Sequence, residues 1–314
     1  MATTAEPLPE LLVDQLSGRG GSSLWKDTLR NVLRQRNALV GLTLLSVLVL
    51  TAIFASQISP FGPTQDLRRT EDVARRDAPC IHALGCPTTQ PQHLMGTDGN
   101  FRDVFSRVVH GSRISLQVGF LTVGFAILIG SIIGAISGYV GGAVDNVLMR
   151  LMDVLLAFPS LLLAIAILTV LGPGLINAQL AIGIVAIPIY ARVLRASVLS
   201  IRELDFVAAS RALGESNVGL LVRRIIPNAL TPLIVQGTLG IGGAVLDVAA
   251  LSFLGLGVQP PDPEWGSMIG EERNQMFSAP HLILFPGIAI TLTVLAFNLL
   301  GDGLRDALDP RLNR

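Results

Sequence analysis

Long apolar stretches separated by shorter polar segments occupy most of the chain after a polar start. A helix rises about 1.5 Å per residue, so about 20 apolar residues cross a hydrocarbon core of about 30 Å. Six stretches approach or exceed that length, at residues 38–58, 114–140, 154–171, 175–194, 230–257 and 282–300. The third and fourth are separated only by a Gly-Pro-Gly turn at residues 172–174. The pattern therefore predicts an all-α integral membrane protein with six transmembrane helices.

The predicted spans divide the chain into segments of different character. These are a polar N-terminal segment (1–37), the first span (38–58), a long loop (59–113) and a core domain with the other five spans (114–314). Apolar residues recur at helical spacing in residues 24–37 and 101–113, which predicts amphipathic helices at the membrane surface. Because the polar start has no apolar core of the signal-peptide kind, we expect the N-terminus to be retained.

Composition supports a membrane location. Half of the residues are hydrophobic and only 15% are charged, compared with roughly 25% charged residues in an ordinary soluble domain. The 32 glycines suit helices that pack closely through small side chains. The net charge is zero, so no long-range field attracts the chain to nucleic acid.

The distribution of arginine and lysine predicts the orientation. Six spans place both termini on one side of the membrane, and that side carries about twice as many of these residues as the other. Cytoplasmic loops are enriched in positive charge, so we expect cytoplasmic termini. The loop at residues 59–113 is then external, and the segment at residues 195–228 is cytoplasmic.

No catalytic motif is present in the chain. Its single lysine, Lys26, follows Trp25, whereas an ATP-binding P-loop requires Gly-Lys-Ser/Thr because the lysine reaches the phosphates. No Gly-x-Ser-x-Gly nucleophile motif occurs, and no two histidines are spaced i, i+4 as a metal pair. The sequence therefore predicts a protein that is not an enzyme. If ATP drives it, another subunit must hydrolyse the ATP.

The polar segment between the fourth and fifth spans, residues 195–228, is the most informative; we call it the coupling segment. A helix ending near Leu213 would be followed by Gly214, which can adopt the left-handed conformation of a helix C-cap. Ser216 or Asn217 could cap a second, shorter helix. Pro227 is expected to break that helix before the fifth span.

The first of these helices carries small side chains at Ala208, Ala209 and Ala212. A smooth, short helix suits docking into a cleft on another protein. An ordinary cytoplasmic loop explains the same residues equally well.

The coupling segment resembles the EAA loop of permease subunits of binding-protein-dependent ABC importers. That loop has a Glu-Ala-Ala triplet, then a glycine, then a closing Leu-Pro. Aligned on Gly214, the triplet falls on Ala-Ala-Ser at residues 208–210 and the closing pair on Ile-Pro at residues 226–227. The glutamate and the second alanine are replaced, so no role of the glutamate can be carried over.

Other motifs narrow the resemblance. They are GTD at residues 96–98, GSRISL at 111–116, DVLLAFP at 153–159, LSFLGLG at 251–257 and NLLGDGLRD at 298–306. Over about residues 25–314 the chain resembles the second (C-type) permease of the dipeptide/oligopeptide/nickel group, and its end is similar to the glutathione importer's permease. Phe101 stands where this group usually has a glycine.

The resemblance implies the type I ABC importer permease fold and a set of partners. Two homologous permeases would form a pore in the cytoplasmic (inner) membrane, two ATP-binding subunits would bind the cytoplasmic loops, and an extracytoplasmic binding protein would deliver a peptide substrate. ATP and Mg²⁺ would be bound by the partner subunits, with no cofactor in this chain. The residues expected to couple to the ATPases are Asp205, Ala208, Ala209, Ser210, Gly214, Glu215 and Ser216.

Cys80 and Cys86 lie in the predicted external loop, where an oxidising environment favours a disulfide. His82 and His93 are close in sequence, so the four side chains could instead ligate a metal ion, although their spacing matches no standard zinc pattern. Two free thiols are the third possibility.

Asp247 falls in the middle of the fifth span, where charged residues usually face a partner or an aqueous cavity. Lining of the substrate path and pairing at the interface between permeases explain it equally well. Asp153, at the start of the third span, is expected at the membrane interface.

Three alternatives remain at this stage. Within the same family, the substrate could be nickel or another small solute. A secondary transporter driven by an ion gradient would usually carry internal repeats and intramembrane acids, and only Asp247 fits that description. A membrane enzyme lacks its catalytic groups here.

Overall fold

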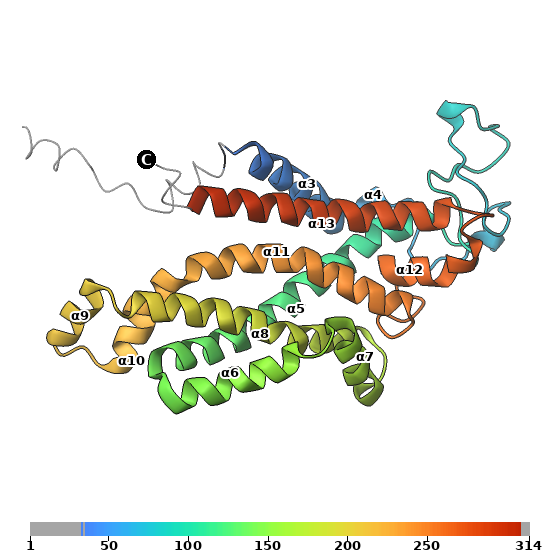
Figure 1. Ribbon diagram of the computed structural model, residues 1–314. Helices are drawn as coiled ribbons and strands as arrows, with labels where there is room; N and C mark the ends of the chain where they lie inside the picture. Colours follow the sequence, from blue (N-terminus) through green and yellow to red (C-terminus); the bar gives the residue numbers. More distant parts are fainter. Residues whose placement is uncertain (1–32, 34, 309–314) are drawn as a thin grey trace, which may run out of the picture.

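The computed structural model describes residues 33 and 35–308, and these are mostly helical. The α-helices are α3 (Arg36–Ile53), α4 (Ala55–Ile58), α5 (Val104–Val140), α6 (Gly142–Leu156), α7 (Ser160–Leu171), α8 (Leu175–Ile201), α9 (Asp205–Ala212), α10 (Asn217–Gly219), α11 (Ile226–Phe253), α12 (Trp265–Glu272) and α13 (His281–Leu308). Short 3-10 turns lie at η1 (Leu67–Arg69), η2 (His82–Leu84) and η4 (Arg273–Gln275), and η3 (Leu220–Ile225) is π-helical. The long helices run side by side, as expected for the predicted all-α class (Figure 1).

Five of the described helices are long and apolar enough to cross a membrane. They are Arg36–Ile53, Val104–Val140, Leu175–Ile201, Asn217–Phe253 and His281–Leu308. Helices α6 and α7 meet the same criterion together as a bent pair, which gives up to six spans. The all-α membrane fold predicted from hydropathy is confirmed.

The third span is not the single helix expected at residues 154–171. Helix α6 ends at Leu156, α7 begins at Ser160, and the two are bent by 91° at this break. Pro159 occupies the N-cap position of α7 with a ψ of 128°, outside the helical region. Its ring would clash with the preceding turn if the helix continued through it. Hydropathy is continuous across the break, so apolar content alone could not locate it.

The second span begins ten residues earlier than predicted, because α5 runs without interruption from Val104. Asp103 caps it by accepting a hydrogen bond from the Ser106 N–H at 2.7 Å. Val104 and Val109 are buried in the protein, so the expected surface helix at residues 101–113 is instead the packed first part of α5. The other expected surface helix, at residues 24–37, lies almost entirely outside the described residues.

Pro227 does not separate the short helix from the fifth span, as the sequence had indicated. Residues Asn217–Phe253 form one continuous helix made of α10, η3 and α11. Proline lacks an N–H and its ring crowds the turn before it, and the wide π-helical turn of η3 immediately precedes it. The coupling segment is therefore continuous with a membrane span.

Glycines set the most extensive helix contact, between α5 and α8. A Cβ on Gly130 would lie 2.8 Å from the Ile187 carbonyl oxygen, and one on Gly138 would lie 2.9 Å from the Arg195 carbonyl oxygen. Gly134, between them, faces the backbone of Ala191 even more closely. This Gly-x-x-x-Gly-x-x-x-Gly stripe lets two backbones approach as membrane helices commonly do.

Helix α11 lies at the centre of the bundle, in contact with α5 and α8 on one side and α13 on the other (Figure 1). Helix α3 packs along α13, where a Cβ on Gly41 would lie 2.6 Å from the Leu300 nitrogen. Helix α12 packs on the end of α11 through Gly266 and Gly270. We call the two ends of this bundle the α9 end and the α12 end.

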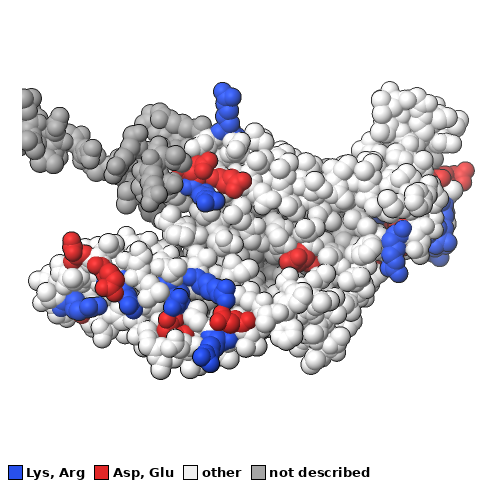
Figure 2. All heavy atoms as spheres, viewed as in Figure 1, with Lys and Arg blue, Asp and Glu red and all other residues white. Residues whose placement is uncertain are grey.

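Charged side chains gather at these two ends and are almost absent between them on the face shown in Figure 2. The same face is hollowed between the α13 side and the α6–α8 side, and an acidic side chain is visible within the hollow (Figure 2). An uncharged belt between two charged ends is the distribution that a bilayer imposes.

Candidate functional site

Helix α9 stands at the tip of the α9 end, beyond the ends of α8 and α11 (Figure 1). Only Val207 of its eight residues is buried, and it packs with Val198, Leu220 and Ile225. The other residues, including Asp205, Ala208 and Ala209, leave an exposed surface, with Ser210 partly covered. One apolar contact thus holds the helix while its small side chains remain free for another protein.

The end of α9 has the geometry expected from the sequence. Gly214 adopts a left-handed φ of +86°, which a residue with a Cβ rarely tolerates. Its N–H donates to the Arg211 carbonyl at 3.0 Å, and the Glu215 N–H donates to the Ser210 carbonyl at 3.2 Å. These two bonds form a Schellman motif, so the chain reverses sharply after α9.

The part of the coupling segment that follows α9 is also held by local contacts. Ser216 Oγ accepts a hydrogen bond from the Gly219 N–H at 3.2 Å and so caps the continuous helix. Glu215 pairs with Arg224 at 3.0 Å, and Asn217 accepts a hydrogen bond from the Tyr139 hydroxyl at 2.9 Å. The predicted coupling residues therefore lie on α9 and in the turn after it, and this turn is joined to α5 and η3.

Larger apolar side chains also protrude from this segment, and sequence reasoning missed them. Leu213 is 88% exposed and Val218 is 72% exposed, and Leu204 and Phe206 are exposed as well. The signal in the sequence is that these large apolar residues occur in a polar segment that is not a membrane span. They give the α9 end an apolar rim suited to a protein partner.

A pocket of about 450 Å³ lies beside α9 and is lined by Tyr139, Val140, Arg202, Glu203, Arg211 and Asn217. Arg202 links α8 to α5, because its Nη1 donates to the Gly138 carbonyl at 2.7 Å. Nearby, Arg195 of α8 pairs with Asp145 of α6 at 2.5 Å. These contacts tie the ends of α5, α6 and α8 together beside α9.

Asp153, expected at the membrane interface, lies in α6 and pairs with Arg192 of α8 at 2.5 Å, with both side chains at least half exposed. Asp247 lies in the fifth of the predicted spans, on α11, and is only partly buried. Within the described part of the chain it has no hydrogen-bond or ion-pair partner. An unpaired charge at the centre of a span costs roughly 2.5–3.5 kcal/mol on insertion scales.

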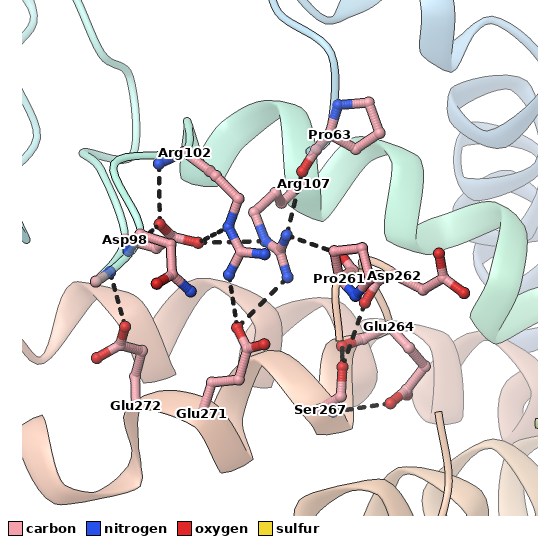
Figure 3. A network of polar contacts seen from close by, with 12 residues as sticks. Pro63, Asp98, Arg102, Arg107, Pro261, Asp262, Glu264, Ser267, Glu271 and Glu272 are labelled. Atoms are coloured by element: carbon pink, nitrogen blue, oxygen red, sulfur yellow. Dashed lines mark hydrogen bonds and ion pairs between the residues drawn. The ribbon is translucent and has the colours of Figure 1, made fainter. Parts of the chain in front are cut away.

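The α12 end holds a network of buried charges (Figure 3). Arg102 and Arg107 point between Asp98 and Glu271: Arg102 lies 2.6 Å from Asp98 and 2.8 Å from Glu271. Arg107 is 1% exposed and donates to the carbonyls of Pro63 and Pro261, each at 3.1 Å. The network ties the long loop and the start of α5 to α12.

A second buried group at the α12 end is centred on His93. Its Nδ1 lies 2.9 Å from Asp103 and its Nε2 lies 3.0 Å from Glu71. Burial disfavours the imidazolium, but the two carboxylates outweigh that effect, and the pKa of His93 is raised.

Cys80 and Cys86 are joined by a disulfide, with Cα atoms 5.4 Å apart. His93 faces the two carboxylates rather than the cysteines. Within the described residues, no three His, Cys, Asp or Glu side chains are placed to hold a metal ion.

Comparison with known proteins identifies a family and several relatives. The family described as binding-protein-dependent transport system inner membrane component matches residues 126–314, and the N-terminal TM domain of oligopeptide transport permease C matches residues 23–79. The dipeptide transport system permease protein DppC of Alkalihalophilus pseudofirmus is 45% identical over 290 residues, covering 92% of this chain and 91% of the relative.

Two further relatives extend the comparison. DppC of Haemophilus influenzae is 44% identical over 281 residues, covering 90% of this chain and 92% of the relative. The glutathione transport system permease protein GsiD of Pectobacterium atrosepticum is 40% identical over 288 residues, covering 92% and 91%. The similarity thus extends over nearly the whole of each chain.

Proposed function

The chain belongs to the family of binding-protein-dependent transport system inner membrane components, and we propose that it is one half of the pore of an ATP-driven peptide importer. One observation carries the proposal: an exposed helix, α9, is held between two spans of a chain whose relatives are permeases for dipeptides and glutathione. Its partners are a homologous permease, two ATP-binding subunits that supply ATP hydrolysis, and an extracytoplasmic binding protein.

The proposed mechanism is mechanical. ATP binding closes the ATPase pair, and its cleft carries α9 with it. The motion reaches α8 through the chain at Arg202, and it reaches α11 through the continuous helix Asn217–Phe253. Both termini and α9 face the cytoplasm, and the α12 end faces the binding protein, as the arginine distribution favours.

The test is reconstitution of the complete transporter in liposomes with its binding protein outside and ATP inside. A radiolabelled dipeptide should accumulate only when ATP is enclosed. Accumulation that follows an imposed proton gradient and ignores ATP would replace the proposal with a secondary transporter. Accumulation of nickel but no peptide would leave the ATP-driven importer standing and would refute only the peptide as its substrate.

A further inference from the structure

Asp247 is an acidic side chain within a membrane span that has no partner among the described residues. It is the single charged residue of α11, and within the described chain it makes no hydrogen bond or ion pair. By contrast, Asp145 and Asp153 of α6 each pair with an arginine of α8. These two carboxylates of α6 are thus satisfied within the chain, whereas Asp247 is left for an outside group.

Asp247 also has open space beside it. Gly243 lies one helical turn away, and a Cβ there would meet nothing within 4 Å. Leu246 and Leu254 flank the same side of α11 and are 50% and 51% exposed. The surroundings of the carboxylate are therefore apolar and unfilled, and they contain no cation from residues 35–308.

The open face of α11 extends along the helix while the rest of the helix is packed. Pro232 and Gly243 are exposed on it, and Gln236 is partly exposed. The remaining surface of α11 contacts α5, α8, α12 and α13. In the pore proposed above, this face of α11 would line the path of the solute.

We propose that Asp247 binds the α-ammonium group of the peptide during its passage, with the first residue of the peptide lying over Gly243. The proposal rests on the function proposed above. An isolated carboxylate in apolar surroundings attracts a cation strongly, and an ammonium offers three N–H donors. A single contact of this kind orients a dipeptide by its α-ammonium group, which free dipeptides share, and does not select among their side chains.

The experiment compares Asp247→Asn with wild type and with Asp247→Glu in the reconstituted transporter. Uptake of a free dipeptide should fall about tenfold or more in Asp247→Asn, because the charge-assisted contact is lost, and Asp247→Glu should restore most of it. The ratio of wild-type to variant uptake is then measured for the same dipeptide after N-acetylation. That ratio should be near one, because the acetylated peptide has no ammonium group for Asp247 to bind. Wild type and variant receive the peptide from the same binding protein, so its selectivity does not affect the ratio.

A second measurement does not depend on uptake of the acetylated peptide. In a Gly243→Cys variant, a dipeptide whose first residue carries a 2-pyridyl disulfide should label the new thiol during turnover. Adding Asp247→Asn should lower that labelling. The absence of labelling during active transport would contradict the proposal.

Two other outcomes also overturn it. Loss of the homologous permease on purification of Asp247→Asn would make Asp247 an interface charge. Equal loss of free and acetylated peptide uptake in an intact complex would make it a structural residue. Failure of wild type to show ATP-dependent peptide uptake would instead refute the proposed function itself.

Discussion

Asp98 and Asp66 each pair with an arginine, but in opposite surroundings. Asp98 is 5% exposed and faces Arg102 and Arg107, whereas Asp66 and its partner Arg68 are at the protein surface. Water screens the exposed pair, and loss of one partner there leaves no buried charge. At Asp98 the loss would leave two guanidinium groups with one remaining anion, Glu271.

We therefore predict that Asp98→Asn destabilises the protein by about 3 kcal/mol or more, as removal of one partner from a buried pair does elsewhere. Denaturation of the purified complex in detergent measures this. Asp66→Asn is the matched control and should leave the midpoint unchanged. Equal effects of the two substitutions would show that burial at the α12 end does not control its stability.

His93 predicts a pH dependence. The folded protein raises the pKa of His93, through Asp103 and Glu71, above its unfolded value of about 6.5. The imidazolium therefore contributes stability that is fully present below pH about 6.5 and is lost as the pH rises through the folded pKa. The thermal midpoint should fall on that rise, and His93→Gln should flatten the change. A His82→Gln variant, altered in the same loop, should keep the wild-type profile.

At the scale of elements, the contact between α5 and α8 depends on the absence of side chains. Gly134 lies between Gly130 and Gly138, and all three face the α8 backbone. Gly124, on the same helix, has nothing within 4 Å of the position of a Cβ. Gly134 and Gly124 are thus the same residue type on the same helix, but the first is tightly packed and the second is open.

Gly134→Leu should consequently force α5 and α8 apart and cost several kcal/mol, seen as loss of the folded monodisperse protein in detergent. Gly124→Leu should express and elute like wild type. If both variants behave alike, the glycine stripe is not the contact that sets this helix pair.

The breaks in the helices show where sequence-based prediction stopped at this scale. An apolar run is a local property, so the apolar parts of α5 and α8 could be placed from the sequence, although α5 begins ten residues earlier than the predicted span. Whether a proline ends a helix depends on the turn before it. Pro159 separates α6 from α7, while Pro227 continues a helix behind a π-helical turn.

At the scale of the whole molecule, the sequence predicted the all-α membrane class from its apolar runs and the left-handed helix end at Gly214 from the glycine itself, because both signals are local in the chain. It could not predict the network of Asp98, Arg107 and Glu271, which joins residues far apart in the chain. Phe101 adopts a left-handed φ of +59°, a conformation that glycine tolerates best, at the position where the resemblance led us to expect glycine. The family pattern had marked the position but not its conformation.

In the proposed mechanism, α9 transmits the motion of the ATPases to the membrane spans. Ala209 is exposed on α9, and Ala143 is exposed on α6 near the same end. A tryptophan at either position is accommodated by the folded chain, but only the one on α9 would prevent entry into a partner's cleft. The two substitutions therefore separate docking from folding.

The most direct measurement is ATP-driven dipeptide uptake, with ATP hydrolysis recorded in parallel, for Ala209→Trp and Ala143→Trp in the reconstituted transporter. Ala209→Trp should lose about tenfold or more of its uptake per ATP hydrolysed, and Ala143→Trp should match wild type. Wild-type uptake per ATP by a correctly inserted Ala209→Trp transporter would contradict this role of α9.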